Sequence, residues 1–165
     1  MITLHEFNQL DAGTADRLIR PCLDVDRWVS GVVDGRPYPS ADQLFAAARE
    51  AADPFTAAEL EQALSHHPRI GEKASGDTTE AGLSRSEQAG LGVDDDVRAR
   101  LAEGNHAYER RFGRIFLIRA AGRSSEEILG QLQARLQNDP DTEDQVVADQ
   151  LRQIALVRLA GVVSP

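Results

Sequence analysis

The sequence predicts an all-α protein, and three features predict it. Apolar residues recur at helical spacing through nearly the whole chain of 165 residues. Several of these stretches begin with a hydroxyl residue followed three positions later by glutamate, which is a typical helix start. Neither an internal repeat nor a low-complexity segment interrupts the pattern. We therefore expect a single compact helical domain over residues 1–165, with about seven or eight helices.

Breaks at proline, glycine and aspartate separate the expected helices. The helix-start pattern known as a capping box is present at residues 3–6, 56–59 and 124–127. Helices are expected over residues 11–20, 26–33, 41–52, 94–111, 124–138 and 142–162, with one more from residue 57 to the paired histidines and another that resumes at Ser84.

Two segments depart from the helical pattern. Residues 71–82 are rich in glycine and small polar residues, and we expect them to form a loop. Residues 114–121 form a short apolar run between Gly113 and Gly122. Because this run is too short for a typical helix, we expect it to be a buried extended segment.

The charge and cysteine content exclude several classes of protein. The formal net charge of −9 argues against nucleic-acid binding, which needs a basic face. No apolar run approaches the length of a membrane span. The single cysteine, Cys22, cannot form an internal disulfide and is expected to be a small buried apolar residue. With no secretion signal pattern at the N-terminus, we expect a cytoplasmic protein.

A charged residue lies on the apolar face of the last helix. Arg158 is four positions after Ile154 and seven after Leu151, so it shares their face. A guanidinium there needs a partner, since an unpaired buried charge is unfavourable. It would bind an anion, or it would be a structural ion pair or a side chain reaching solvent at the helix end.

Glu87 shows a similar pattern, because it lies four positions from both Leu83 and Leu91. A carboxylate on a buried face can act as an acid–base group, since burial raises its pKa towards neutrality. The competing interpretation is a capping box formed by Ser84 and Glu87 at a helix start.

The stretch "SHHPRIGE" places two histidines directly before a proline. Adjacent helical residues point about 100° apart, so His66 and His67 are poorly placed to bind one metal ion together. Pro68 restricts the backbone around His67, which favours a preorganised acid–base group. The alternative is a histidine that only stabilises the end of a helix.

These motifs together resemble one known family. "HPRIGEK" at residues 67–73, followed by "SRSEQAG" at residues 84–90, is similar to the 2-oxo-4-hydroxy-4-carboxy-5-ureidoimidazoline (OHCU) decarboxylase family of urate and purine degradation. The segments "RWVSGVVDGRPY", "YERRFGRIFLIRAAGRSSEEIL" and "LRQIALVRL" extend the resemblance over nearly the whole chain, in order.

The resemblance implies an all-α lyase, commonly a homodimer, that uses no cofactor and no metal and converts OHCU to (S)-allantoin. Its catalytic pair falls on His67 and Glu87. Its substrate-binding positions fall on Pro68, Ser84, Gln88 and Arg158, and on the backbone near Ile118. Two residues depart from the family pattern, since Arg119 stands where a small or apolar residue is expected and His66 is not a required residue.

Two other functions are compatible with the same residues. The first is a non-catalytic helical domain that binds a small anion or a protein partner, with His67 and Glu87 acting only at helix ends. The second is a metal hydrolase that uses His66 and His67, although the sequence has neither HExxH nor a cysteine cluster.

Overall fold

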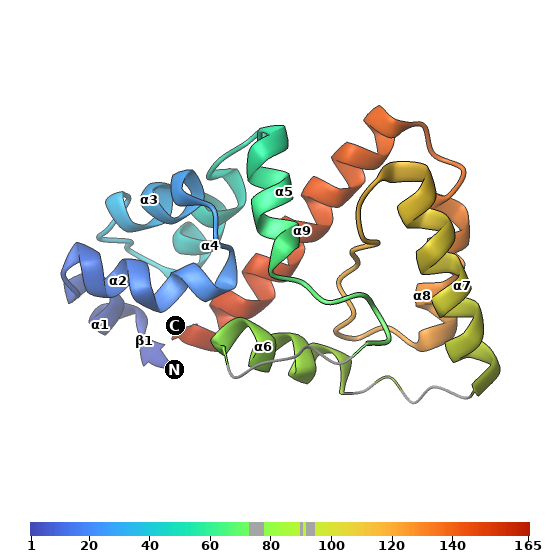
Figure 1. The fold of residues 1–165 in the computed structure, drawn as a ribbon. Coiled ribbons are helices and arrows are strands. Elements are labelled where there is room, and N and C mark those ends of the chain that lie inside the picture. The colour runs from blue at the N-terminus through green and yellow to red at the C-terminus, as the bar shows by residue number, and fades with distance from the viewer. Residues whose placement is uncertain (73–77, 90, 92–94) are drawn as a thin grey trace. The chain divides into compact units, whose positions relative to one another are not determined.

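The computed structural model describes residues 1–72, 78–89, 91 and 95–165. Nine α-helices and two very short strands lie in this part of the chain, which confirms the all-α class (Figure 1). The chain divides into two compact units. Unit 1 is Met1–Ala63 with Arg152–Pro165, and unit 2 is Leu64–Leu151. That the whole chain acts as one domain stays a prediction.

Unit 1 is built from short helices whose apolar faces meet. Its elements are β1 (Ile2–Thr3), α1 (Leu4–Gln9), α2 (Ala12–Ile19), a 3₁₀ turn (Arg20–Cys22), α3 (Asp26–Asp34), α4 (Ala41–Glu50), most of α5 (Ala57–Ser65), the C-terminal part of α9 (Pro140–Val162) and β2 (Val163–Ser164). Trp28 is fully buried, and its Nε1 donates to Ala48 O at 2.8 Å, which joins α3 to α4. Cys22 is buried, as predicted.

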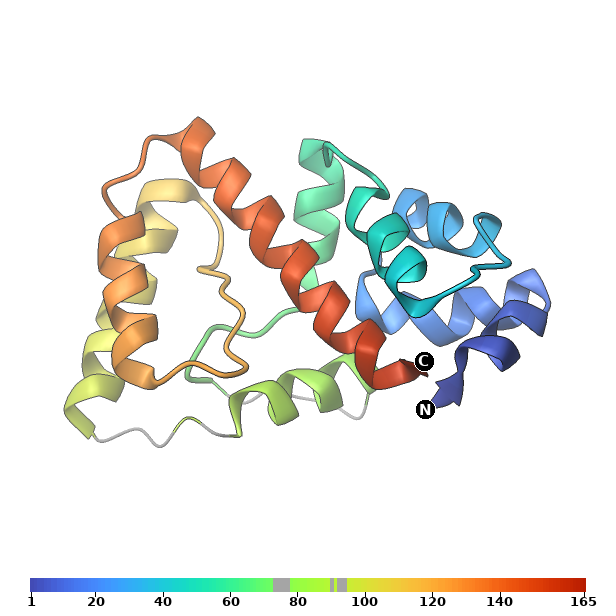
Figure 2. The same cartoon turned by 180° about the vertical axis from the view of Figure 1, so that it is seen from behind.

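The two ends of the chain meet in unit 1. Strands β1 and β2 pair in parallel, with Ile2 opposite Val163 and Thr3 opposite Ser164 (Figure 2). The helical pattern of the sequence did not predict this pairing. Because a two-residue strand leaves no alternating pattern to detect, only the contact between the chain ends reveals it.

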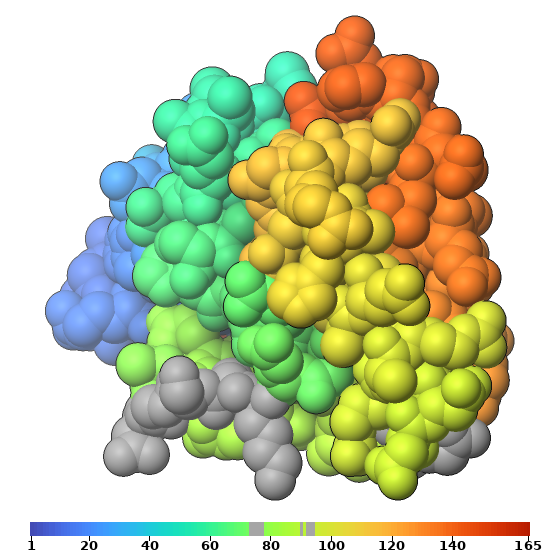
Figure 3. All heavy atoms as spheres, turned by 45° about the vertical axis from the view of Figure 1, so that its right-hand side comes forward, coloured from blue at the N-terminus to red at the C-terminus, as the bar shows by residue number. Residues whose placement is uncertain are grey.

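Unit 2 contains α6 (Thr79–Gln88), α7 (Asp95–Phe112), α8 (Ser125–Arg135) and the first part of α9. The segment after α5 lies against α7, as the green and yellow atoms of Figure 3 show. Helices α7 and α8 pack closely at Gly104, where an added Cβ would come within 2.5 Å of Leu132 Cδ2. A larger residue at Gly104 would therefore push the two helices apart.

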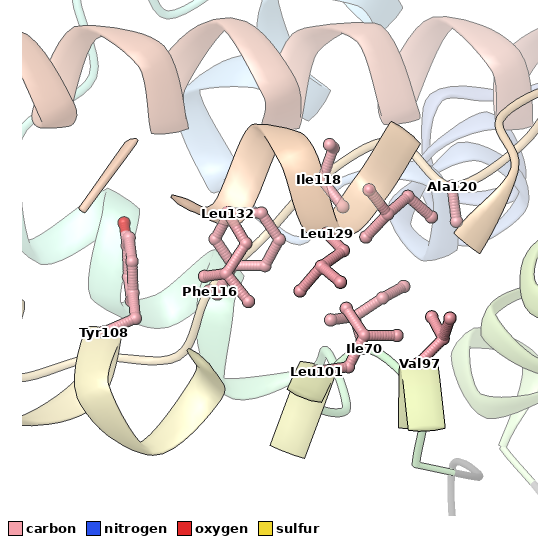
Figure 4. Close-up of a cluster of buried hydrophobic side chains, with 10 residues drawn as sticks. Ile70, Val97, Leu101, Tyr108, Phe116, Ile118, Ala120, Leu129 and Leu132 are labelled. Carbon is pink, nitrogen blue, oxygen red and sulfur yellow. The ribbon is translucent and has the colours of Figure 1, made fainter. Parts of the chain in front are cut away.

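The apolar core of unit 2 brings α7, α8 and the run at residues 114–121 together (Figure 4). Tyr108 and Phe116 meet edge to face, with ring centroids 5.3 Å apart. Residues 115–120 are neither helix nor strand, and Phe116, Leu117 and Ile118 are buried. The prediction of a buried extended segment is thus confirmed.

The predicted helix starts are mostly confirmed. Capping boxes form at Thr3 and Glu6, at Thr56 and Glu59, and at Ser124 and Glu127. Helix α9, by contrast, begins at Pro140 rather than at residue 142, because Asp139 accepts the Thr142 N–H at 2.9 Å and caps it.

The predicted start of α6 at Ser84 is wrong. Helix α6 begins at Thr79, with the Thr78 hydroxyl accepting the Ala81 N–H at 3.1 Å. The expected loop at residues 71–82 therefore ends before Thr79, and residues 73–77 lie outside the described residues. Ser84 lies in the second half of α6, so the interpretation of Ser84 and Glu87 as a capping box is wrong as well.

Candidate active site

His67 lies just beyond the end of α5, on a backbone fixed by turns. Its N–H donates to Leu64 O at 3.1 Å, and the Glu72 N–H donates to Arg69 O at 3.0 Å. His67 is half-buried, whereas His66 is exposed. The two histidines therefore differ in environment, and the catalytic role of His67 stays a prediction.

Helix α7 holds the segment that follows His67. Asn105 is buried, and its Nδ2 donates to Ile70 O at 3.0 Å. Arg69 forms a two-point ion pair with Glu109, one turn further along α7, with Nη2 3.0 Å from Oε2. Hydrogen bonding from Arg69 lowers the pKa of Glu109 below its usual range. Both contacts fix the backbone directly after Pro68.

Ser84, Glu87 and Gln88 lie on one side of the last turns of α6. Their spacing of three and four residues places them on neighbouring positions of the helix surface. Ser84 is buried, with 2% of its surface exposed, and Glu87 and Gln88 are half-buried. Glu87 is therefore a partly buried carboxylate near the C-terminal end of a helix, where the helix dipole disfavours a negative charge.

One hydrogen bond joins the two predicted motifs. The Gly71 N–H donates to Gln88 Oε1 at 3.0 Å. Gly71 adopts a positive φ of 86°, a conformation that favours glycine, and this turns its N–H towards α6. The bond uses the oxygen of the Gln88 amide, so its Nε2 is the end that can donate to a ligand.

Ile118 lies in the extended segment of unit 2, with 5% of its surface exposed. The neighbouring Arg119 is half-buried, and its N–H donates to Gln150 Oε1 at 2.9 Å. Arg119 Nε is buried without a hydrogen-bond partner in the described part of the chain.

Arg158 belongs to unit 1, whereas the other six predicted site residues belong to unit 2. As its spacing predicted, it is buried on α9, with 4% of its surface exposed. Its Nη1 donates to Pro21 O at 3.2 Å. The guanidinium therefore has a structural contact, and its role in substrate binding stays a prediction.

A cavity of about 380 Å³ lies beside the bond that joins the two motifs. Its lining residues are Gly71, Glu72, Arg85, Gln88, Ala89, Leu91, Arg98 and Leu101. Among the predicted site residues, Gln88 lines this cavity and the others are not part of its wall as described.

Four side chains that hold the site segments were not predicted from the sequence, namely Asn105, Glu109, Arg135 and Gln150. Asn105 could have been found, because it lies four residues after Leu101 and three before Tyr108 on the apolar face of α7. The same test had identified Arg158 on α9. Arg135, three positions after Leu132, and Gln150, three positions after Val147, lie on apolar faces in the same way.

Among the described residues, no helix combines the length and the apolar character needed to span a membrane. Within the same residues, no group of three or more His, Cys, Asp or Glu side chains lies close enough together to hold a metal ion.

Comparison with known proteins gives a consistent match. The sequence model of the OHCU decarboxylase family matches residues 8–160. An OHCU decarboxylase from Haloferax volcanii is 27% identical over 96% of this chain and 95% of its own length. One from Amia calva is 31% identical over 81% of this chain and 78% of its own.

Longer relatives and solved structures agree with this match. The chain spans about a third of the uric acid degradation bifunctional proteins of Bacillus, at 26% and 27% identity. A crystal structure of an OHCU decarboxylase in the presence of (S)-allantoin aligns with a TM-score of 0.71 and 25% identity, covering 88% of this chain and 96% of that one. A crystal structure of an (S)-allantoin synthase shares the fold, with a TM-score of 0.75 and 17% identity over 98% of this chain and 54% of that one.

Proposed function

Because the chain belongs to the OHCU decarboxylase family, we propose that it catalyses the decarboxylation of OHCU to (S)-allantoin in urate degradation. The match covers most of the chain and most of the length of two relatives that carry this name. The structural observation that supports the proposal best is the bond from Gly71 to Gln88, which connects the histidine segment to the glutamate segment.

The chemistry of the substrate defines what the protein must supply. The carboxylate leaves a ring carbon that also bears a hydroxyl and lies next to a ring C=N bond. When the carbon–carbon bond breaks, its electron pair forms a new C=C bond and the C=N electrons move to nitrogen. The nitrogen takes up a proton and carbon dioxide departs. The enol-like intermediate then gains a second proton at the former C=N carbon, on one face, and loses its hydroxyl proton. The C=N bond accepts the electrons, so the reaction requires no metal or cofactor.

We assign the proton transfers to His67, with Glu87 as its acid–base partner. An imidazole titrates near neutral pH and can both accept the hydroxyl proton and deliver one to carbon. Glu87 would orient the imidazole, share its proton, or disfavour the substrate carboxylate by repulsion. The half-buried positions of both residues in unit 2 are compatible with each of these roles.

The remaining predicted residues would hold the substrate. Gln88 Nε2 and the Ser84 hydroxyl are neutral donors for its ureido and carbonyl oxygens. Pro68 would line the site, and the backbone near Ile118 would contact the substrate. Arg158 would bind an oxygen pair through its planar fork of donors.

The family resemblance also underlies two wider proposals. We propose that the protein is a homodimer and that it acts in the cytoplasm. The presence of a single, buried cysteine agrees with a reducing compartment. Sedimentation equilibrium of the purified chain at several concentrations tests the dimer.

The reaction itself is tested by polarimetry. OHCU is generated in the cuvette from urate by the preceding enzymes, this protein is added, and optical rotation is followed over time. Spontaneous decay produces both enantiomers, so net rotation requires an enzyme that protonates one face. We expect rotation of the (S)-allantoin sign to develop at a rate proportional to protein concentration. A trace that equals the protein-free control would contradict the proposal.

A further inference from the structure

Buried polar side chains fix the peptide groups on both sides of Ile118. Leu117 O accepts a hydrogen bond from Arg135 Nη1 at 2.7 Å. On the other side, the Arg119 N–H donates to Gln150 Oε1 at 2.9 Å. Arg135 and Gln150 are 4% and 8% exposed, so water does not compete strongly for either bond. Residues 115–120 form neither helix nor strand, so these bonds replace the backbone hydrogen bonds of regular secondary structure.

This arrangement determines where the Ile118 N–H points. Among the described peptide bonds, only two X–Pro bonds are cis, so the Leu117–Ile118 peptide is trans. In a trans peptide the C=O and N–H point in opposite directions. The Ile118 N–H therefore points away from Arg135, and it makes no hydrogen bond to any described residue.

The guanidinium of Arg135 is itself fixed in place by a buried ion pair. Its Nε and Nη2 donate to Glu143 Oε1 at 2.8 and 2.6 Å, and its guanidinium lies 4.5 Å from the Phe116 ring centroid. Tyr108 donates to the same carboxylate oxygen at 2.5 Å. A cation bound to a carbonyl polarises the whole peptide group, which makes the N–H at its other end a stronger donor.

We propose that Arg135 and Gln150 are positioning residues that hold the Ile118 N–H as a preorganised donor for an oxygen of the substrate. This inference rests on the proposed function, because it deepens the role of one predicted site residue. A donor fixed before the reaction stabilises developing charge without reorganising. Arg135 and Gln150 act through the backbone of Ile118 and need no contact with the substrate themselves.

Gln150→Met tests the inference, because methionine has a similar size but offers no good acceptor to the Arg119 N–H. We expect kcat/KM to fall about 10- to 100-fold, the range expected when a reacting group is slightly misplaced. Gln150→Glu keeps an acceptor oxygen and should restore most of the activity, which a loss of packing alone would not explain. Gln145→Met is the matched control on an exposed position of α9, and its activity should equal that of the wild type.

NMR adds a second readout, which observes the Ile118 amide directly. In the wild type, titration with (S)-allantoin should shift the Ile118 amide proton downfield, and in Gln150→Met this shift should shrink. An active wild type whose Ile118 amide does not move when product binds would overturn the inference alone. Full activity in a folded Gln150→Met would do the same. An inactive wild type would overturn the proposed function together with the inference.

Discussion

The two units of the chain differ in how they bury polar side chains. Of the buried polar or charged side chains in the described residues, Ser84, Asn105, Ser125, Arg135, Glu143 and Gln150 lie in unit 2, and only Arg158 lies in unit 1. In unit 1, aromatic donors are satisfied by helix carbonyls, as with Trp28 on Ala48 O and Tyr38 on Val32 O. Its ion pairs, such as Arg27 with Glu59, remain partly exposed.

The difference follows from the backbone that each unit must hold. In unit 2, the segments with His67 and Ile118 have no regular secondary structure, so their backbone groups need side-chain partners. Asn105, Arg135 and Gln150 provide them. Among the described residues, three of the six buried polar side chains of unit 2 thus hold segments that the proposed site needs, and the exception in unit 1, Arg158, is itself a predicted site residue.

The largest stability effect is expected from Glu143→Gln. This change leaves Arg135 buried without its charge partner, since Glu143 accepts from Arg135 and is fully buried. Breaking such a pair costs about 3–5 kcal/mol of unfolding free energy. Glu59→Gln makes the same chemical change in the partly exposed pair of unit 1, and it should cost about 1 kcal/mol or less.

Urea denaturation of the two glutamine variants measures both values. Burial and the bond to Glu143 raise the pKa of Tyr108 to about 12, so the tyrosine stays protonated in this experiment. Equal losses in the two variants would show that burial does not distinguish the two units.

Glu87→Gln is expected to affect activity rather than stability. Because Glu87 lies late in α6 and caps no helix start, the substitution removes no structural cap. If Glu87 is the acid–base partner of His67, kcat should fall about 100-fold or more. Polarimetry and thermal denaturation on the same samples test this, and near wild-type turnover at unchanged stability would remove Glu87 from the mechanism.

Arg158→Met tests the exception in unit 1. If the guanidinium binds the substrate, the variant should raise KM about 10- to 100-fold, since bonds to a charged group contribute about 1.5–3 kcal/mol. Methionine is of similar size, so if Arg158 mainly serves the substrate the variant should lose far less stability than activity. Arg158→Lys keeps the charge but loses the planar set of donors that fits two oxygens, so it should also bind substrate poorly. A clear loss of stability with retained activity would show that Arg158 is a structural residue that bonds Pro21 and does not bind the substrate.

The smallest effect concerns acid stability in unit 1. Hydrogen bonding from Arg27 lowers the pKa of Glu59 from 4.5 to about 2. A lowered pKa means that the ionised form stabilises the folded state above pH 4.5 and that this contribution is lost as the pH falls towards 2. Because Arg27 is half exposed, we expect about 1 kcal/mol of pH-dependent stability. In denaturation measurements between pH 6 and pH 3, the wild type should therefore lose about 1 kcal/mol more unfolding free energy than Glu59→Gln, whose other carboxylates still titrate.

Local signals allowed much of the helical architecture to be predicted. The capping boxes at Thr3, Thr56 and Ser124 involve residues three positions apart, and their hydrogen bonds form as expected. The start of α6 was missed because the true cap, Thr78, has Ala81 rather than a glutamate three residues later. Ser84 and Glu87 match the full capping-box pattern although they lie within the helix. A local pattern alone does not distinguish a helix start from a position inside a helix.

The bonding partners of the side chains that hold the site could not be predicted in the same way. Asn105 bonds to Ile70 and Gln150 to Arg119, over separations of 35 and 31 residues. Helical spacing places these side chains on apolar faces, but the backbone group that each one bonds depends on how the elements pack. Arg158 was identified because its own helix supplies the apolar positions that make it unusual.

The comparison of His67→Ala with His66→Ala tests the central claim most directly. Both variants remove one imidazole from neighbouring positions, and their rates of optically active allantoin formation are measured by polarimetry against the wild type. General acid–base groups contribute about 100- to 10,000-fold to rate, so we predict that the rate of His67→Ala falls by this factor. His66 is exposed, and we predict that His66→Ala keeps most of the wild-type rate. Equal losses in the two variants, or an active His67→Ala, would contradict the account.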